Sequence, residues 1–246
     1  MLVDRITETR TLIRSAVIEH LYQWWARDGL LYRRLRLPNG QIDPAVLRKI
    51  ARAYGVSRGI LEGQEANVGG LIVTNLNNWP EDLVARAQVV RHIAEEAKGR
   101  FTRGLLLSAF SKLVWFAKPQ GWTLYDSYAR AGLKAPRHGD DFARYYIRLQ
   151  DIDFQTAMDL SRNVIAHSAF PYLHPERIHD AYLMLCNKPR PDTLPMMAHR
   201  SCDDILDLWA TFHGSSLRDK VEDLVSDLAS EITDKPAFQV HTKEDF

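Results

Sequence analysis

Apolar residues recur at helical spacing over most of the chain. Near the N-terminus, Leu12, Val17 and Leu21 fall close to one face of a helix predicted over residues 9–28, and Gly29 is a natural place for that helix to end. The same spacing predicts further helices over residues 43–54, 81–98, 103–117, 124–133, 139–150, 154–168, 175–186, 201–213 and 215–233. The sequence therefore predicts an all-α globular protein of about nine or ten helices.

Residues that begin and end helices support this pattern. Asp43 stands at a natural N-cap position, and Pro44 occupies the first helical position after it. Gly55, Gly99 and Gly214 each follow a predicted helix, where glycine ends a helix easily because it adopts the left-handed conformation without strain. These signals place the helix boundaries independently of the hydrophobic spacing.

Three segments depart from the helical pattern. Residues 33–42 contain a Pro-Asn-Gly turn signal. Residues 55–79 are rich in glycine, and we expect a short strand at 71–74 followed by a polar loop. The tail from Lys235 onward has little periodicity, so we expect it to fray.

Composition excludes several classes of protein. The chain has 246 residues, of which 46% are hydrophobic and 10% aromatic, values that exclude a disordered protein. No long uncharged apolar run occurs, so we expect no membrane partner, and the charged N-terminus lacks the apolar core of a secretion signal. Only Cys186 and Cys202 are present, too few for a disulfide framework, so we expect a cytoplasmic protein.

The formal net charge of +1 conceals a division along the chain. Residues 1–150 hold 23 Lys and Arg against 14 Asp and Glu, whereas residues 201–246 hold 4 against 11. A proline-rich stretch at 187–199 lies between them. We therefore predict a basic helical body at 1–186 and an acidic C-terminal helical pair at 200–246.

The segment 108–133 is the most informative for function. Ser111 and Lys112 precede an apolar and aromatic run, a turn with Pro119 and Gly121 follows, and Asp126 stands where the next helix needs an N-cap. This order predicts a helix, a turn and a second helix that an aspartate opens.

This pattern resembles bacterial 8-oxoguanine glycosylase-like proteins, which belong to the helix-hairpin-helix DNA glycosylase group. The resemblance covers about 26 residues and implies a helix-hairpin-helix-like element at 104–133. It implies a DNA repair enzyme, a hydrolase acting on an oxidised purine without a cofactor, with Lys112 as nucleophile and Asp126 as assisting carboxylate. The flipped base would stack on an aromatic side chain, and the candidates are Trp115, Trp122 and Tyr125.

Basic residues interleaved with aromatic ones suit a nucleic-acid surface, because cations contact phosphates and rings stack on bases. The candidate DNA-binding residues are Arg33, Arg34, Arg36, Arg130, Lys134 and Arg137. Histidines cluster late in the chain, but His199 and Cys202 lack a recognised ligand spacing, so we expect no metal.

Simpler interpretations remain open at this stage. Lys112 can lay its stem on apolar surface with its ammonium in water, and Asp126 can serve only as a cap. The divided charge also suits a non-enzymatic interaction module that docks in a larger complex or with a second copy of the chain. A third alternative is that the acidic segment at 201–246 covers the basic surface and mimics DNA.

Overall fold

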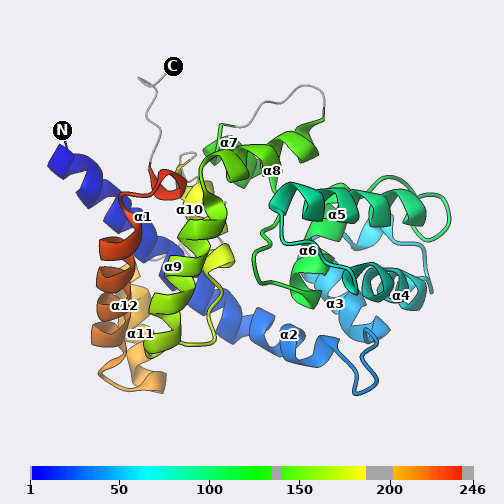
Figure 1. Ribbon diagram of the computed structural model, residues 1–246. Coiled ribbons are helices and arrows are strands. Elements are labelled where there is room, and N and C mark those ends of the chain that lie inside the picture. Colours follow the sequence, from blue (N-terminus) through cyan, green and yellow to red (C-terminus); the bar gives the residue numbers. More distant parts are fainter. Residues whose placement is uncertain (1, 135–139, 187–201, 240–246) are drawn as a thin grey trace. The chain divides into compact units, whose positions relative to one another are not determined.

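The computed structural model describes residues 2–134, 140–186 and 202–239, and side chains from residue 7 onward (Figure 1). The described residues contain no strand and are predominantly helical, which confirms the all-α prediction. Their helices are α1 (Leu2–Gln23), α2 (Gly29–Leu35), α3 (Pro44–Ala53), α4 (Glu65–Leu76), α5 (Leu83–Ala97), α6 (Leu107–Ala117), α7 (Ser127–Gly132), α8 (Asp141–Asp151), α9 (Phe154–His167), α10 (Pro175–Cys186), α11 (Cys202–His213) and α12 (Leu217–Ile232).

The chain forms two compact units that alternate along the sequence. Unit 1 comprises 1–23, 127–135 and 148–246, and unit 2 comprises 24–126 and 136–147. One boundary falls between Gln23 and Trp24, where α1 passes into a π-helical turn that continues directly into α2. The acidic helices α11 and α12 belong to unit 1.

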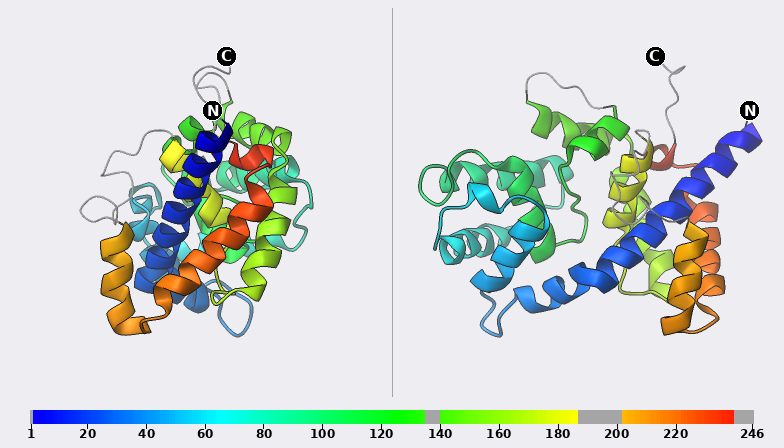
Figure 2. Two further views of the ribbon diagram at one scale, coloured as in Figure 1. Left: turned by 90° about the vertical axis from the view of Figure 1, so that its left-hand side faces the viewer. Right: turned by 180° about the vertical axis from the view of Figure 1, so that it is seen from behind.

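Unit 1 is built around α1, which packs against α10 and α12. Ile13, Val17 and Leu21 recur on the buried face of α1, and Val221 and Leu228 contribute from α12. Helix α11 lies beside α12, as the two views in Figure 2 show. Burial of these apolar faces stabilises the unit, since most helical stability in proteins comes from packing of an apolar face.

Unit 2 is organised around α6, which contacts α2, α3, α4 and α5. Every residue of α6 from Ala109 to Phe116 is buried, including the polar Ser111 and Lys112. A helix that is covered on all sides holds its side chains in fixed positions. Lys112 therefore stands on a helix whose central residues are all buried.

Several predicted boundaries are confirmed. The Asp43 side chain accepts hydrogen bonds from the backbone N–H groups of Ala45 (2.8 Å) and Val46 (3.2 Å), as an N-cap does. Gly55 and Gly99 have positive φ values of 68° and 74° just after α3 and α5. These three signals are confirmed because each is a local backbone preference.

Two predictions in the N-terminal half are wrong. Residues 71–74 form part of α4 rather than a strand, because Val68, Ile72 and Leu76 bury one helical face. Gly29 does not end a helix but begins α2, which follows directly on the π-helical turn after α1. A Cβ at Gly29 would lie 2.8 Å from the Trp24 indole nitrogen, so this glycine makes room for a side chain.

The predicted fraying of the C-terminal tail is also wrong for its first residues. Residues 236–238 form a 3₁₀ turn, and both Ala237 and Phe238 are buried. The Tyr182 hydroxyl donates to the Phe238 carbonyl (2.6 Å), and His179 Nε2 lies 2.9 Å from the Ala237 carbonyl. These contacts with α10 supply the order that local periodicity lacks.

Candidate functional site

Lys112 and Asp126 lie close together in unit 2. Lys112 Nζ is 3.5 Å from the Asp126 carboxylate, and the lysine side chain is 11% exposed. Lys112 also donates to the Ser108 hydroxyl at 3.1 Å, one helical turn earlier on α6. The lysine that sequence reasoning selected is thus enclosed and paired, and it does not extend into open solvent.

The segment that leads to Asp126 is held against α6 by two serines. The Ser108 hydroxyl donates to the Tyr125 carbonyl (3.1 Å), and the Ser111 hydroxyl accepts from the Tyr125 N–H (3.0 Å). The Trp122 indole donates to the Ser111 carbonyl at 3.0 Å. Because these bonds fix the backbone just before Asp126, the carboxylate is positioned by α6 itself.

Two of the three predicted base-stacking residues are core residues. Trp115 and Trp122 are fully buried. Trp122 stacks on Tyr146 with ring centroids 4.4 Å apart, and Trp115 packs edge-on against Phe116. Both indole faces are covered in the folded core, so neither is accessible to a base while the core is intact.

Tyr125 is in a different position, because its side chain is only partly buried. It lines an open hollow of about 410 Å³ together with Leu107, Phe142, Arg91, Asp140 and Asp141. Its ring meets Phe142 edge-on at 5.1 Å between centroids. Tyr125 is therefore the aromatic residue of the predicted three that borders both a cavity and the segment carrying Asp126.

The predicted DNA-binding residues are divided between the units. Arg33 and Arg34 are exposed on α2, and Arg36 donates to the carbonyl of Ala117 at the end of α6 (3.2 Å), all within unit 2. Arg130 and Lys134 belong to unit 1. Arg137 lies outside the described residues.

Sequence reasoning missed a buried charged cluster in unit 1. Glu176, Arg177 and Asp180 on α10 are at most 6% exposed, and Arg177 pairs with Asp180. Glu176 pairs with Arg162 of α9, and the Arg177 guanidinium also donates to the Gln23 side chain (2.7 Å). The sequence signal for this cluster is the i, i+3 spacing of Arg177 and Asp180. Ion pairs on exposed helices have the same spacing, so it does not indicate burial.

Two histidines complete this cluster, which we call the buried charge cluster. His20 Nε2 accepts a hydrogen bond from the His174 backbone N–H (3.1 Å), so the ring proton of neutral His20 is on Nδ1. Burial and the charge of Arg177 hold the pKa of His20 well below its usual range. Burial, with Arg162 and Arg177 nearby, lowers the pKa of His174 to about 4. Both rings are therefore neutral at pH 7.

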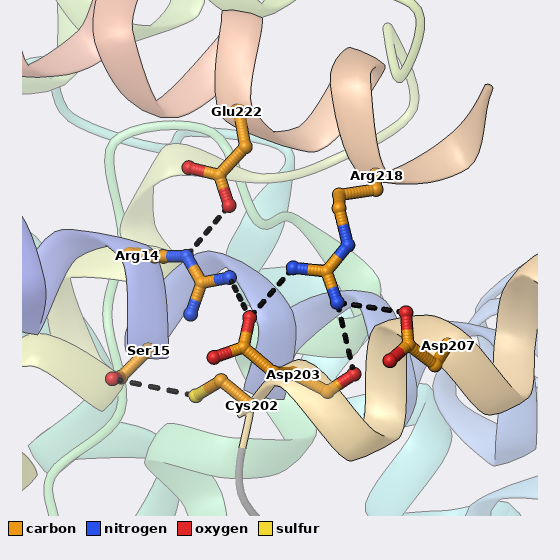
Figure 3. Close-up of polar contacts among 7 residues, drawn as sticks. All are labelled: Arg14, Ser15, Cys202, Asp203, Asp207, Arg218 and Glu222. Carbon is orange, nitrogen blue, oxygen red and sulfur yellow. Dashed lines mark hydrogen bonds and ion pairs between the residues drawn. The ribbon is translucent and has the colours of Figure 1, made fainter.

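Arg14 of α1 joins the acidic helices to the rest of unit 1 (Figure 3). Its guanidinium donates to Asp203 of α11 (2.8 Å) and to Glu222 of α12 (2.7 Å). Arg218 bridges Asp203 and Asp207, with both bonds at 2.7 Å. Some of the acidic side chains of α11 and α12 therefore form ion pairs within unit 1, although most of these side chains remain exposed.

Metal-binding clusters and membrane-spanning helices are both absent from the described ranges. No group of three or more His, Cys, Asp or Glu side chains in them is arranged to hold a metal ion. None of the described helices combines the length and the apolar character that crossing a bilayer requires.

Comparisons with protein-family models, with curated proteins and with solved structures find no match to this chain.

Proposed function

We propose that the protein binds DNA and removes an oxidised purine by the chemistry of a helix-hairpin-helix glycosylase. The observation that carries this proposal is the enclosed pair of Lys112 and Asp126, 3.5 Å apart on α6 and just before α7. A nucleophilic amine must lose its proton before it attacks, and a carboxylate at this distance is suitably placed to assist. The resemblance of residues 108–133 to 8-oxoguanine glycosylase-like proteins suggests the same two roles.

In the proposed reaction, the Lys112 amine attacks C1′ of the damaged nucleotide. The bond between C1′ and the base nitrogen breaks, the base leaves with the bonding electrons and takes up a proton, and the amine loses one. Asp126 orients the amine and offsets the positive charge that develops on the sugar. Opening of the sugar ring then gives an imine between Lys112 and C1′, which borohydride reduces to a stable amine.

The partly buried Tyr125 fits the role of base contact better than either buried tryptophan. Its ring borders a hollow of about 410 Å³, of the size that small-molecule sites have. Arg91 and Asp140 pair at the same hollow and provide hydrogen-bonding groups there. Tyr125, which lines this hollow, directly precedes Asp126 in the sequence.

The test is borohydride trapping on a DNA duplex that contains 8-oxoguanine. We expect the wild-type protein to give a covalent protein–DNA adduct, and Lys112→Gln to give none while circular dichroism shows it folded. Lys118→Ala is the matched control, because Lys118 is an exposed lysine at the end of the same helix. Absence of both base release and adduct with the wild-type protein would overturn the proposal.

A second candidate function is a non-enzymatic interaction module. It is favoured by two apolar side chains one turn apart on α11, Leu208 and Phe212, which are 42% and 77% exposed. Contiguous exposed apolar groups with a polar rim are typical of protein-binding surfaces.

Light scattering and DNA binding at low and high salt separate the two functions. A monomer with salt-sensitive DNA binding supports the glycosylase proposal, since phosphate contacts weaken as salt rises. An oligomer that Phe212→Ser disrupts, with no DNA binding, supports the interaction module.

A further inference from the structure

Unit 2 holds an arginine-lined hollow that none of the roles above uses. Its volume is about 280 Å³, and it opens on α3, the following 3₁₀ turn and the segment before α6. The charged side chains that line it are Arg48, Arg52, Arg58, Arg103, Glu62 and Glu65. We call this hollow the arginine pocket.

The backbone holds the walls of the arginine pocket in place. Arg48 and Arg52 are four residues apart on α3 and so share a helical face. The Arg103 backbone N–H donates to the Gly59 carbonyl (2.8 Å), and the Leu61 N–H donates to the Phe101 carbonyl (2.9 Å). These two bonds join the segments that carry Arg58 and Arg103, so the arginines of separate segments are brought to one hollow.

The charge in the pocket is not balanced. Arg48 is paired with Glu65 at 2.6 Å. Across the described ranges, Arg52, Arg58 and Arg103 form no ion pair or side-chain hydrogen bond, and all three are exposed. Among the side chains that the structure describes, most other arginines contact a carboxylate or a carbonyl, as Arg14, Arg91 and Arg177 do. Three guanidinium groups around one hollow suit an oxyanion.

We propose that the arginine pocket binds a phosphate group of a DNA strand, and this inference rests on the DNA-binding function proposed above. Guanidinium groups bind phosphate oxygens in pairs of parallel hydrogen bonds, which gives both charge and direction. Glu62 and Glu65 reduce the excess charge of the four arginines to +2. That modest excess suits a singly charged phosphodiester, and the open form of the hollow admits a continuous strand.

The test compares two double variants of the full chain in a fluorescence anisotropy titration with a duplex. Arg58→Ala with Arg103→Ala removes two charges from the pocket. Lys49→Ala with Lys98→Ala removes two charges from exposed positions of the same unit that do not line the pocket. We expect the arginine variant to bind about tenfold more weakly and its salt slope to fall by about one. We expect the lysine variant to bind as the wild type does.

The outcomes separate failure of the pocket from failure of the proposed function. If the wild type binds DNA and the arginine variant binds equally well, the pocket proposal is overturned and DNA binding stands. If the wild type binds no DNA, DNA binding is overturned together with the DNA source of the phosphate.

A titration with inorganic phosphate, followed by thermal shift, then judges the pocket itself. Stabilisation that is lost only in the arginine variant supports a phosphate site with a free anion as its source. Absence of stabilisation in the wild type, in a protein that also binds no DNA, overturns the site. Arg58→Lys with Arg103→Lys is the conservative variant, and it should restore part of the binding because charge is kept without the paired hydrogen bonds.

Discussion

The two units differ in where they place their charged side chains. Unit 1 encloses ion pairs in its core, with Arg177 on Asp180 and Arg162 on Glu176. Unit 2 leaves three arginines exposed around the arginine pocket. A buried charge must be paired to be tolerated, whereas an exposed one is available to a ligand. The buried charge cluster of unit 1 therefore serves packing, and the exposed arginines of the arginine pocket in unit 2 are available for binding.

Removal of one partner in the buried charge cluster should give the largest effect. Arg177→Ala leaves the Asp180 carboxylate buried without its partner and should lower the free energy of unfolding by about 3–5 kcal/mol. Urea denaturation followed by circular dichroism measures the change. The control Lys220→Ala, at an exposed position on α12, should leave the unfolding midpoint unchanged. Equal effects of the two variants would contradict the role of the buried ion pair in the stability of unit 1.

Acid should weaken unit 1 through its neutral histidines. The pKa of His174 is about 4 in the folded chain and about 6.5 when unfolded, so the unfolded state binds the proton first as pH falls. The contribution of His174 to the free energy of unfolding is therefore fully present above about pH 6.5. It is lost as the pH falls towards 4, a decrease of about 3 kcal/mol. Urea denaturation at pH 7.5 and pH 5 measures this slope, and His174→Gln should reduce it.

Close packing between α7 and α10 gives a smaller effect. A Cβ added at Gly132 would collide with the backbone carbonyl of Leu183, so Gly132→Ala should destabilise unit 1 by about 1–3 kcal/mol. Gly70→Ala is the matched control, because nothing lies near its added Cβ on α4 and the change should stabilise by roughly 0.5–1 kcal/mol. Opposite shifts in melting temperature are expected, and shifts of the same sign would contradict the packing argument.

The smallest expected effect concerns a local cap in unit 2. Asp43→Ala removes the side-chain acceptor at the start of α3 and should cost about 1 kcal/mol. Asp43→Asn keeps an acceptor there and should restore most of the stability. Asp43→Ala keeps every arginine of the pocket and affects Arg48 and Arg52 only through the start of α3. Its DNA affinity should therefore fall less than that of the arginine pocket variant. A loss of DNA affinity in Asp43→Ala as large as that in the arginine pocket variant would contradict this expectation.

Sequence reasoning located the helices better than the surfaces. Caps such as Asp43 and ends such as Gly99 depend on nearby backbone groups, and they were placed correctly. The strand expected at 71–74 was wrong, because glycine and β-branched residues weaken the helical pattern that packing enforces there. In the candidate site, the nearness of Lys112 and Asp126 agrees with the motif, but the burial of Trp115 and Trp122 was not visible in it.

The sequence by itself determined the all-α class, most helix boundaries and the candidate pair of Lys112 and Asp126, because these depend on spacing within one or two neighbouring elements. Tertiary structure alone decided which charges are enclosed and which are exposed. Glu176 and Arg52 are both charged residues of ordinary helices, yet one is fully buried and the other lines an open pocket. Their difference arises from contacts between elements far apart in the chain, which local spacing does not encode.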